Sequence, residues 1–174
     1  KPQEINWKYY EIENVRWHQI GHLQTNKVKY IIDKVCLIHS VDSMKLAEEI
    51  NKRAAAKGII MDVLVEINIA GEEAKHGVPL NEAEALAVEI SSLENVRVKG
   101  LMTVAPFVED PEENRKYFRQ MKNLFVDIDK KSYNNIDMKY LSMGMTNDYE
   151  VAVEEGANIV RIGTGLFGAR DYSK

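Results

Sequence analysis

The sequence contains one cysteine, four prolines and no long uninterrupted apolar run. With Cys36 alone, the chain can form neither an internal disulfide nor a metal site built from several cysteines. No segment approaches the roughly 20 apolar residues that a membrane-spanning helix needs, and residues 1–4 lack the apolar stretch of a secretory signal. These absences predict a cytoplasmic protein that is not embedded in a membrane.

Basic residues are not in excess either. The 23 Lys and Arg residues against 27 Asp and Glu residues give a formal net charge of -4. A protein that follows a nucleic-acid backbone concentrates Lys and Arg on one surface. The most basic short stretch carries Lys27, Lys29 and Lys34 among apolar residues at helical spacing, which favours a solvated helix face. We therefore expect no nucleic-acid partner.

What is present is typical of a globular protein. A length of 174 residues with 45% hydrophobic and 29% charged residues is enough for a sizeable core. We expect one domain over residues 1–174. Short apolar runs alternate with segments of helical periodicity. The predicted strands are 17–22, 35–40, 61–69, 96–103, 138–142 and 158–162, and the main predicted helices are 44–57, 79–93, 111–131 and 149–155.

Polar residues at helix starts and strand ends refine this prediction. We expect Asp42 or Ser43 to cap the helix 44–57, and Thr146 or Asn147 to cap the helix 149–155. Alternating strands and helices predict a parallel sheet, either open and doubly wound or a (β/α) barrel. Polar residues end every predicted strand, which favours the barrel because its active site gathers all strand ends on one face. A full barrel has eight strands, so we expect two strands to be missing before Lys1.

The segment 163–168 reads GTGLFG and formally matches the dinucleotide-binding pattern G-x-G-x-x-G. Too few residues follow Gly168 for the helix, second strand and acidic residue of that motif, so we reject this interpretation. Gly163 and Thr164 still offer backbone N–H groups and a hydroxyl that suit a phosphate. A plain glycine-rich turn is the alternative.

A second loop of similar character precedes this one. Ser142, Met143 and Gly144 end a strand just before a predicted helix, whose N-terminus would attract anions. Arg161 lies in the last strand, and side-chain alternation directs it into the barrel interior. A charged residue there needs a partner, so a functional contact and an internal salt bridge both stay open. His22 and His76 lack metal-ligand spacing with another histidine, and we expect no metal site.

Five segments in order along the chain resemble the pyridoxal phosphate homeostasis proteins, relatives of the alanine racemase N-terminal barrel. They are WHQIGHLQTNK at 17–27, VEINIAGEEAKHG at 65–77, GLMT at 100–103, LSMGM at 141–145 and VRIGTGLFG at 160–168. The resemblance implies a (β/α) barrel that binds pyridoxal 5′-phosphate (PLP). It places Ser142, Gly163 and Thr164 around the phosphate and Arg161 at the pyridine nitrogen, with Met143 and Gly144 completing the candidate cofactor-binding residues.

The same resemblance implies a PLP carrier in vitamin B6 and amino-acid homeostasis, without enzymatic turnover. We expect the chain to be a monomer or weak homodimer. In this family the Schiff-base lysine lies on the first barrel strand, which would precede Lys1. None of Lys27, Lys29, Lys75 and Lys99 takes its place. The alternatives are a PLP-dependent racemase-like enzyme and a fragment that binds only phosphate.

Overall fold

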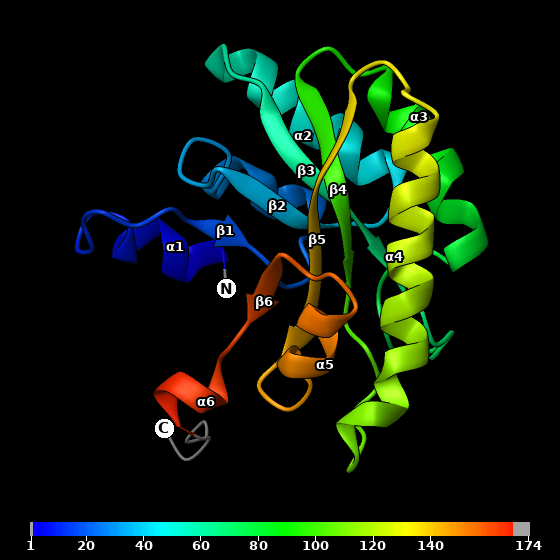
Figure 1. Cartoon of the computed structure of the whole chain (residues 1–174). Helices are drawn as coiled ribbons and strands as arrows, with labels where there is room; N and C mark the ends of the chain where they lie inside the picture. Colours follow the sequence, from blue (N-terminus) through cyan, green and yellow to red (C-terminus); the bar gives the residue numbers. More distant parts are fainter. Residues whose placement is uncertain (1, 169–174) are drawn as a thin grey trace.

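The computed structural model describes residues 2–168 and has a curved parallel sheet with helices along its outer face (Figure 1). Its six strands lie side by side in chain order, and every neighbouring pair is parallel. The strands are β1 His18–Gln19, β2 Leu37–Val41, β3 Met61–Ile67, β4 Val96–Thr103, β5 Ile136–Met145 and β6 Ile159–Arg161. Each overlaps one predicted range, so the predicted parallel α/β arrangement is confirmed.

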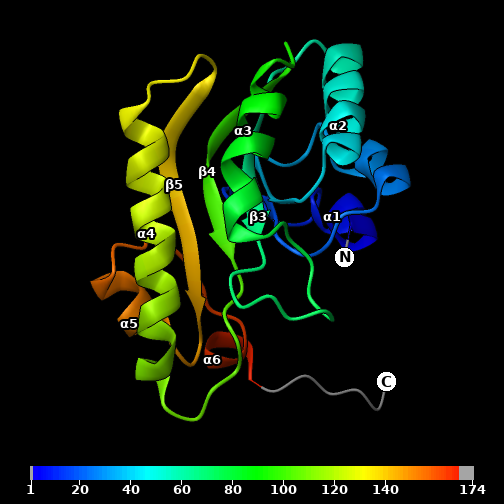
Figure 2. The same ribbon diagram turned by 90° about the vertical axis from the view of Figure 1, so that its right-hand side faces the viewer.

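Parallel neighbours need crossover connections, and these contain most of the helices. They are η1 Thr25–Tyr30, α2 Met44–Lys57, η2 Leu80–Glu82, α3 Ala83–Ser91, η3 Pro111–Asn114, α4 Arg115–Lys130 and α5 Tyr149–Glu154. Figure 2 shows α2, α3 and α4 along the outer face of the sheet. Two short helices, α1 Pro2–Lys8 and α6 Thr164–Phe167, lie before the first strand and after the last.

The helix caps agree with the sequence in one case and differ in another. Ser43 caps α2, because its hydroxyl accepts a hydrogen bond from the backbone N–H of Leu46 at 3.4 Å. The prediction that Thr146 or Asn147 caps α5 is wrong. Asp148 holds the N-cap position there without making a side-chain capping bond.

The two faces of the sheet differ in character. The outer face packs against the helices in the main hydrophobic core. The inner face carries a smaller apolar cluster of Leu37, Leu64 and Met102, against which Tyr140 and Ile159 pack. Side chains two residues apart in a strand share a face. Four buried polar side chains share the inner face with this cluster, because each lies two residues after one of these apolar residues. They are His39 after Leu37, Glu66 after Leu64, Ser142 after Tyr140 and Arg161 after Ile159. The inner face therefore adds a polar layer to its apolar one.

The sheet is open between β1 and β6, which are its edges in residues 2–168. Helix α1 and both edge strands border a cavity in this opening. The arrangement agrees with a partial (β/α) barrel. That two further strands precede Lys1 and complete the barrel stays a prediction. Among the helices of residues 2–168, none is long and apolar enough to cross a membrane.

Candidate functional site

Arg161, at the end of β6, places a positive charge inside the curved sheet. It is 8% exposed, and its two terminal nitrogens donate hydrogen bonds to Ser142 Oγ and to the backbone oxygen of Thr103, each at 2.7 Å. Burial lowers the pKa of Arg161 to about 10, against the opposing effect of Glu66 and Asp148, so the guanidinium stays cationic at neutral pH. The predicted inward direction is confirmed. Its direct partners are neutral oxygens, and no described carboxylate forms an internal salt bridge with it.

Two histidines extend this contact into a chain of hydrogen bonds across the interior. His39 Nδ1 lies 3.0 Å from Ser142 Oγ, and His39 Nε2 lies 3.0 Å from His18 Nδ1. The pKa of His39 is lowered to about 3, mainly by burial and also by nearby His18 and Arg161. Burial also lowers the pKa of His18, with a smaller effect from Arg16. Both rings are therefore neutral at pH 7, and the chain fixes the orientation of Arg161.

Glu66 on β3 adds an ionisable carboxyl group to the same inner face. It is 8% exposed, and its Oε2 has no hydrogen-bond partner among residues 2–168. The pKa of Glu66 is raised to about 7, mainly by burial and also by Asp42, against the opposing effect of Arg161. A carboxyl group with this pKa exchanges its proton near neutral pH, and its unpaired oxygen can accept a hydrogen bond from a ligand.

A cavity of about 830 Å³ opens beside the loops that follow β4, β5 and β6. Gly163 and Thr164 line it, and both are exposed. The loops after β5 and β6 meet here, because the backbone N–H of Gly165 donates a hydrogen bond to Thr146 Oγ1 at 3.2 Å. Val104, Ala105, Pro106, Phe107 and Phe167 supply apolar lining. The cavity therefore joins polar groups that suit a phosphate to a surface that suits a ring.

A second cavity of about 730 Å³ lies between α1, β1 and β6. Arg161 and His18 both line it, so the two ends of the hydrogen-bonded chain reach the same cavity. Gly163 borders both cavities. A small molecule bound at Gly163 is therefore within reach of Arg161 as well as of Thr164.

The six residues predicted to bind a cofactor fall into two groups. Arg161, Gly163 and Thr164 line the cavities, whereas Ser142, Met143 and Gly144 are buried. The hydroxyl of Ser142 is bonded to Arg161 and His39, and Met143 packs in the main core. The geometry therefore favours the first group for direct contact with a ligand and gives Ser142 the task of holding Arg161. The cofactor-binding roles of all six stay predictions.

Two lysines line the cavities, and neither lies on a strand. Lys75 is in the loop after β3, as predicted, and borders the first cavity. Its Nζ lies 2.8 Å from Glu72 Oε1 and donates a hydrogen bond to the backbone oxygen of Ala105 at 3.2 Å. Lys8 lies on α1 and borders the second cavity.

Sequence reasoning missed His18, His39 and Glu66 as parts of the site. His39 and Glu66 stand at inward positions of apolar strands, two residues after Leu37 and Leu64. A polar residue at such a position is costly to bury and is a signal that could have found them. Their partners could not be found in this way, because His39 and its hydrogen-bond partner on β5 are 103 residues apart in the sequence.

Comparison with known proteins extends the resemblance over nearly the whole chain. Residues 10–171 match the family model of the alanine racemase N-terminal domain. A curated relative from Aquifex aeolicus, a pyridoxal phosphate homeostasis protein, is 49% identical over 172 residues. The match covers 98% of this chain and 75% of that relative.

Two solved structures of one protein show the same fold. PipY of Synechococcus elongatus without PLP matches with a TM-score of 0.88 and 31% identity. PipY with PLP bound matches with a TM-score of 0.84 and 29% identity. Each match covers 97% of this chain and 79% of the PipY chain. These likenesses confirm the α/β fold of the alanine racemase N-terminal type.

Proposed function

This chain belongs to the pyridoxal phosphate homeostasis proteins of the alanine racemase N-terminal domain family, and from this premise we propose that it binds PLP as a non-catalytic carrier. The observation that carries the proposal is the placement of Arg161, Gly163 and Thr164 where two cavities meet. When bound, PLP supplies an aldehyde and an electron-withdrawing ring. A role in vitamin B6 and amino-acid balance is part of the same proposal.

The phosphate group is assigned to Gly163 and Thr164. Both residues are exposed, and a Cβ added to Gly163 would meet nothing within 4 Å, so a ligand can approach this backbone closely. Thr164 contributes a hydroxyl group, and the backbone N–H groups of Gly163 and Thr164 lie beside it at the start of α6. The next three N–H groups of this segment already donate hydrogen bonds, to Thr146 Oγ1 and to the backbone oxygen of Gly163. The hydroxyl of Thr164 and the N–H groups of Gly163 and Thr164 fit the phosphate of PLP.

The ring nitrogen is assigned to Arg161. The bonds from its guanidinium to Ser142 and Thr103 hold the cation in one orientation at the second cavity. A fixed positive charge disfavours a proton on the nearby ring nitrogen. An unprotonated ring withdraws electrons less strongly, which supports a carrier over a racemase-like enzyme.

Titration with PLP, followed by absorbance, tests the phosphate assignment. We expect Thr164→Val to weaken PLP binding by about tenfold or more, because a hydrogen bond to a charged group contributes about 1.5–3 kcal/mol. Thr25→Val, the same chemical change in η1 and outside both cavities, is the matched control and should bind like the wild type. Equal affinities for wild type and Thr164→Val would show that Thr164 does not hold the phosphate.

Competition with inorganic phosphate separates PLP binding from simple anion binding. A PLP site also contacts the ring, so inorganic phosphate should displace PLP only in large molar excess. Displacement at comparable concentrations would instead indicate a fragment that binds only phosphate.

We also propose that the chain acts in the cytoplasm as a monomer or weak homodimer that does not bind nucleic acid. Its formal net charge of -4 supports the last point. Sedimentation over a range of protein concentrations tests the oligomeric state, and a dimer that persists on dilution would contradict it.

A further inference from the structure

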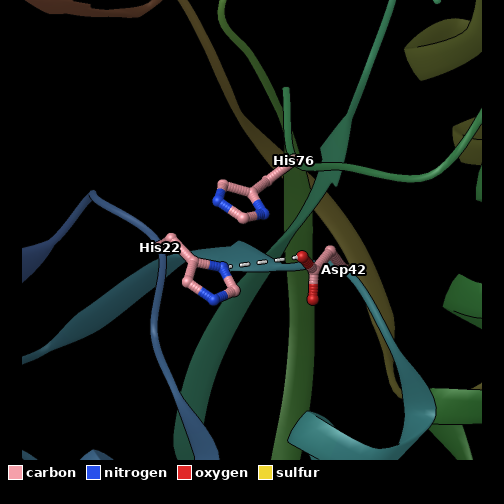
Figure 3. Close-up of side chains that lie close together, drawn as sticks. All are labelled: His22, Asp42 and His76. Carbon is pink, nitrogen blue, oxygen red and sulfur yellow. Dashed lines mark ion pairs between the residues drawn. The ribbon is translucent and has the colours of Figure 1, made fainter. Parts of the chain in front are cut away.

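We propose that His22, Asp42 and His76 form a binding site for a divalent transition metal ion such as Zn²⁺. Each side chain offers one ligand atom, and these atoms all lie within 4.8 Å of one another. Figure 3 shows the two imidazole rings one above the other, with the carboxylate of Asp42 beside them. Sequence spacing gives no sign of this site, because each residue comes from a different loop.

The three loops lie next to one another for a topological reason. His22 follows β1, Asp42 directly follows β2, and His76 lies in the loop after β3. These strands are parallel neighbours, so their carboxyl ends meet on the same edge of the sheet. Residues 54 positions apart, His22 and His76, are thereby brought into ring contact.

The distances are close to those of a metal centre. His22 Nδ1 lies 3.9 Å from Asp42 Oδ2, and the centroids of the His22 and His76 rings lie 3.7 Å apart with 9° between their planes. Metal bonds of about 2.0–2.2 Å in a tetrahedral site place ligand atoms about 3.4 Å apart. The stacked rings must fan apart, because each nitrogen lone pair lies in its ring plane. Both histidines are exposed, so their side chains have room to rotate.

Two hydrogen bonds fix the backbone next to His22. The carbonyl oxygen of Gly21 accepts two side-chain hydrogen bonds, from Ser40 Oγ at 2.9 Å and from Gln19 Nε2 at 2.8 Å. The Ser40 contact joins this loop to β2, the strand that ends next to Asp42. The backbones that carry His22 and Asp42 are therefore held at a fixed separation.

The loop that carries His76 is fixed in a similar way. The side chain of Asn68 accepts a hydrogen bond from the backbone N–H of Glu72 at 3.1 Å and donates one to its carbonyl oxygen at 2.8 Å. Gly77 has a φ of 104°, and a Cβ there would lie 2.6 Å from the backbone nitrogen of Asn68. The chain next to His76 therefore packs tightly against the end of β3.

The chemistry of the three residues suits a transition metal. Two imidazole nitrogens and one carboxylate oxygen are common ligands of Zn²⁺, and three protein ligands leave one position for water. Lys75 is the cation next in sequence, and Glu72 forms an ion pair with it at 2.8 Å. That ion pair reduces the repulsion that Lys75 would exert on a metal ion beside His76.

Calorimetric titration of the full chain with ZnCl₂ tests the site, with any polyhistidine tag removed and without PLP. The wild type should bind one Zn²⁺ ion per chain. His22→Ala, His76→Ala and Asp42→Asn should each weaken binding by about tenfold or more, because each removes a direct metal ligand. Glu73→Gln changes an exposed acid in the same loop and outside the cluster, so it should leave the affinity within about twofold.

Nuclear magnetic resonance of the histidine rings gives a second readout that needs no variant. Zn²⁺ should shift the imidazole resonances of His22 and His76 and leave those of buried His39 in place. Uptake of Zn²⁺ by the ligand variants at wild-type affinity would overturn the proposal. So would resonances of His22 and His76 that stay unchanged at a stoichiometric amount of Zn²⁺.

Discussion

The charge of Arg161 is held in the interior by two oxygen acceptors rather than by a carboxylate. Ser142 is the acceptor that a substitution can remove, since the other acceptor is a backbone oxygen. Strand alternation was enough to predict that Arg161 points inward. It could not predict the partner, because the contact with Ser142 depends on how β5 and β6 pair.

Ser142→Ala should lower the free energy of unfolding by about 2 kcal/mol, because it leaves a buried charged donor without its acceptor. Urea unfolding measures the change. Ser91→Ala is the matched control, since the Ser91 hydroxyl only bonds a carbonyl of its own helix, and it should change stability by less than about 0.5 kcal/mol. A similar loss in both variants would mean that Ser142 does not support Arg161.

Glu66 and His39 should give opposite contributions to the pH dependence of stability. The folded-state pKa of Glu66, about 7, lies above the ordinary value of 4.5, so its stabilising contribution is full below pH 4.5 and falls as the pH rises to 7. The folded-state pKa of His39, about 3, lies below 6.5, so stability rises between pH 3 and 6.5 as the unfolded chain loses its proton. Between pH 4.5 and 6.5 the two effects oppose each other.

Glu66→Gln should therefore make the free energy of unfolding rise more steeply with pH in this window than it does in the wild type. His39→Gln should change the slope in the other direction. Each change approaches about 1.4 kcal/mol per pH unit, the value for one proton. Urea unfolding at several pH values provides the slopes, and curves parallel to that of the wild type would refute the buried ionisation of these groups.

Among the elements, the strands β4 and β5 approach each other closely at a glycine of β4, residue 100. Gly100 has a φ of 141°, and a Cβ there would overlap the backbone oxygen of Tyr140 on β5. The pairing of the two strands is irregular at this point, where the register shifts between Val98 and Gly100. A side chain at position 100 would push the neighbouring strands apart.

Gly100→Ala should lower the free energy of unfolding by about 3 kcal/mol or more, or prevent folding. The added Cβ would collide with backbone atoms of β5, which cannot move aside as a flexible side chain can. Gly58→Ala is the comparison. Gly58 also has a positive φ, 65°, but its added Cβ would meet nothing within 4 Å, so only conformational strain of about 1 kcal/mol is expected. Thermal unfolding of both variants measures these losses of stability. Equal losses would show that steric overlap does not explain the effect at position 100.

The strands and most helices could be predicted from the sequence because hydrophobic periodicity is a local signal. The predicted helix 44–57 coincides with α2, and the predicted range 96–103 coincides with β4. Residues 111–131 were predicted as one helix, but the first turn forms η3 before α4 begins. The helices α1 and α6 were missed, since they are too short to show a periodic pattern.

At the scale of the whole molecule, alternating strands and helices predicted a parallel sheet with polar groups at one edge. The curvature of the sheet could not be predicted in this way, because it sums small twists over all six strands. That curvature brings His39 of β2 close to Ser142 of β5, although β3 and β4 lie between these strands in the sheet. It also places Arg161 and His18 on one cavity.

A crystal structure of this chain with PLP tests the central proposal most directly. We expect the phosphate at Gly163 and Thr164, the ring nitrogen facing Arg161, and no covalent bond from PLP to a lysine. PLP bound elsewhere, or joined to Lys75 or Lys8 at the cavity walls, would contradict the proposal.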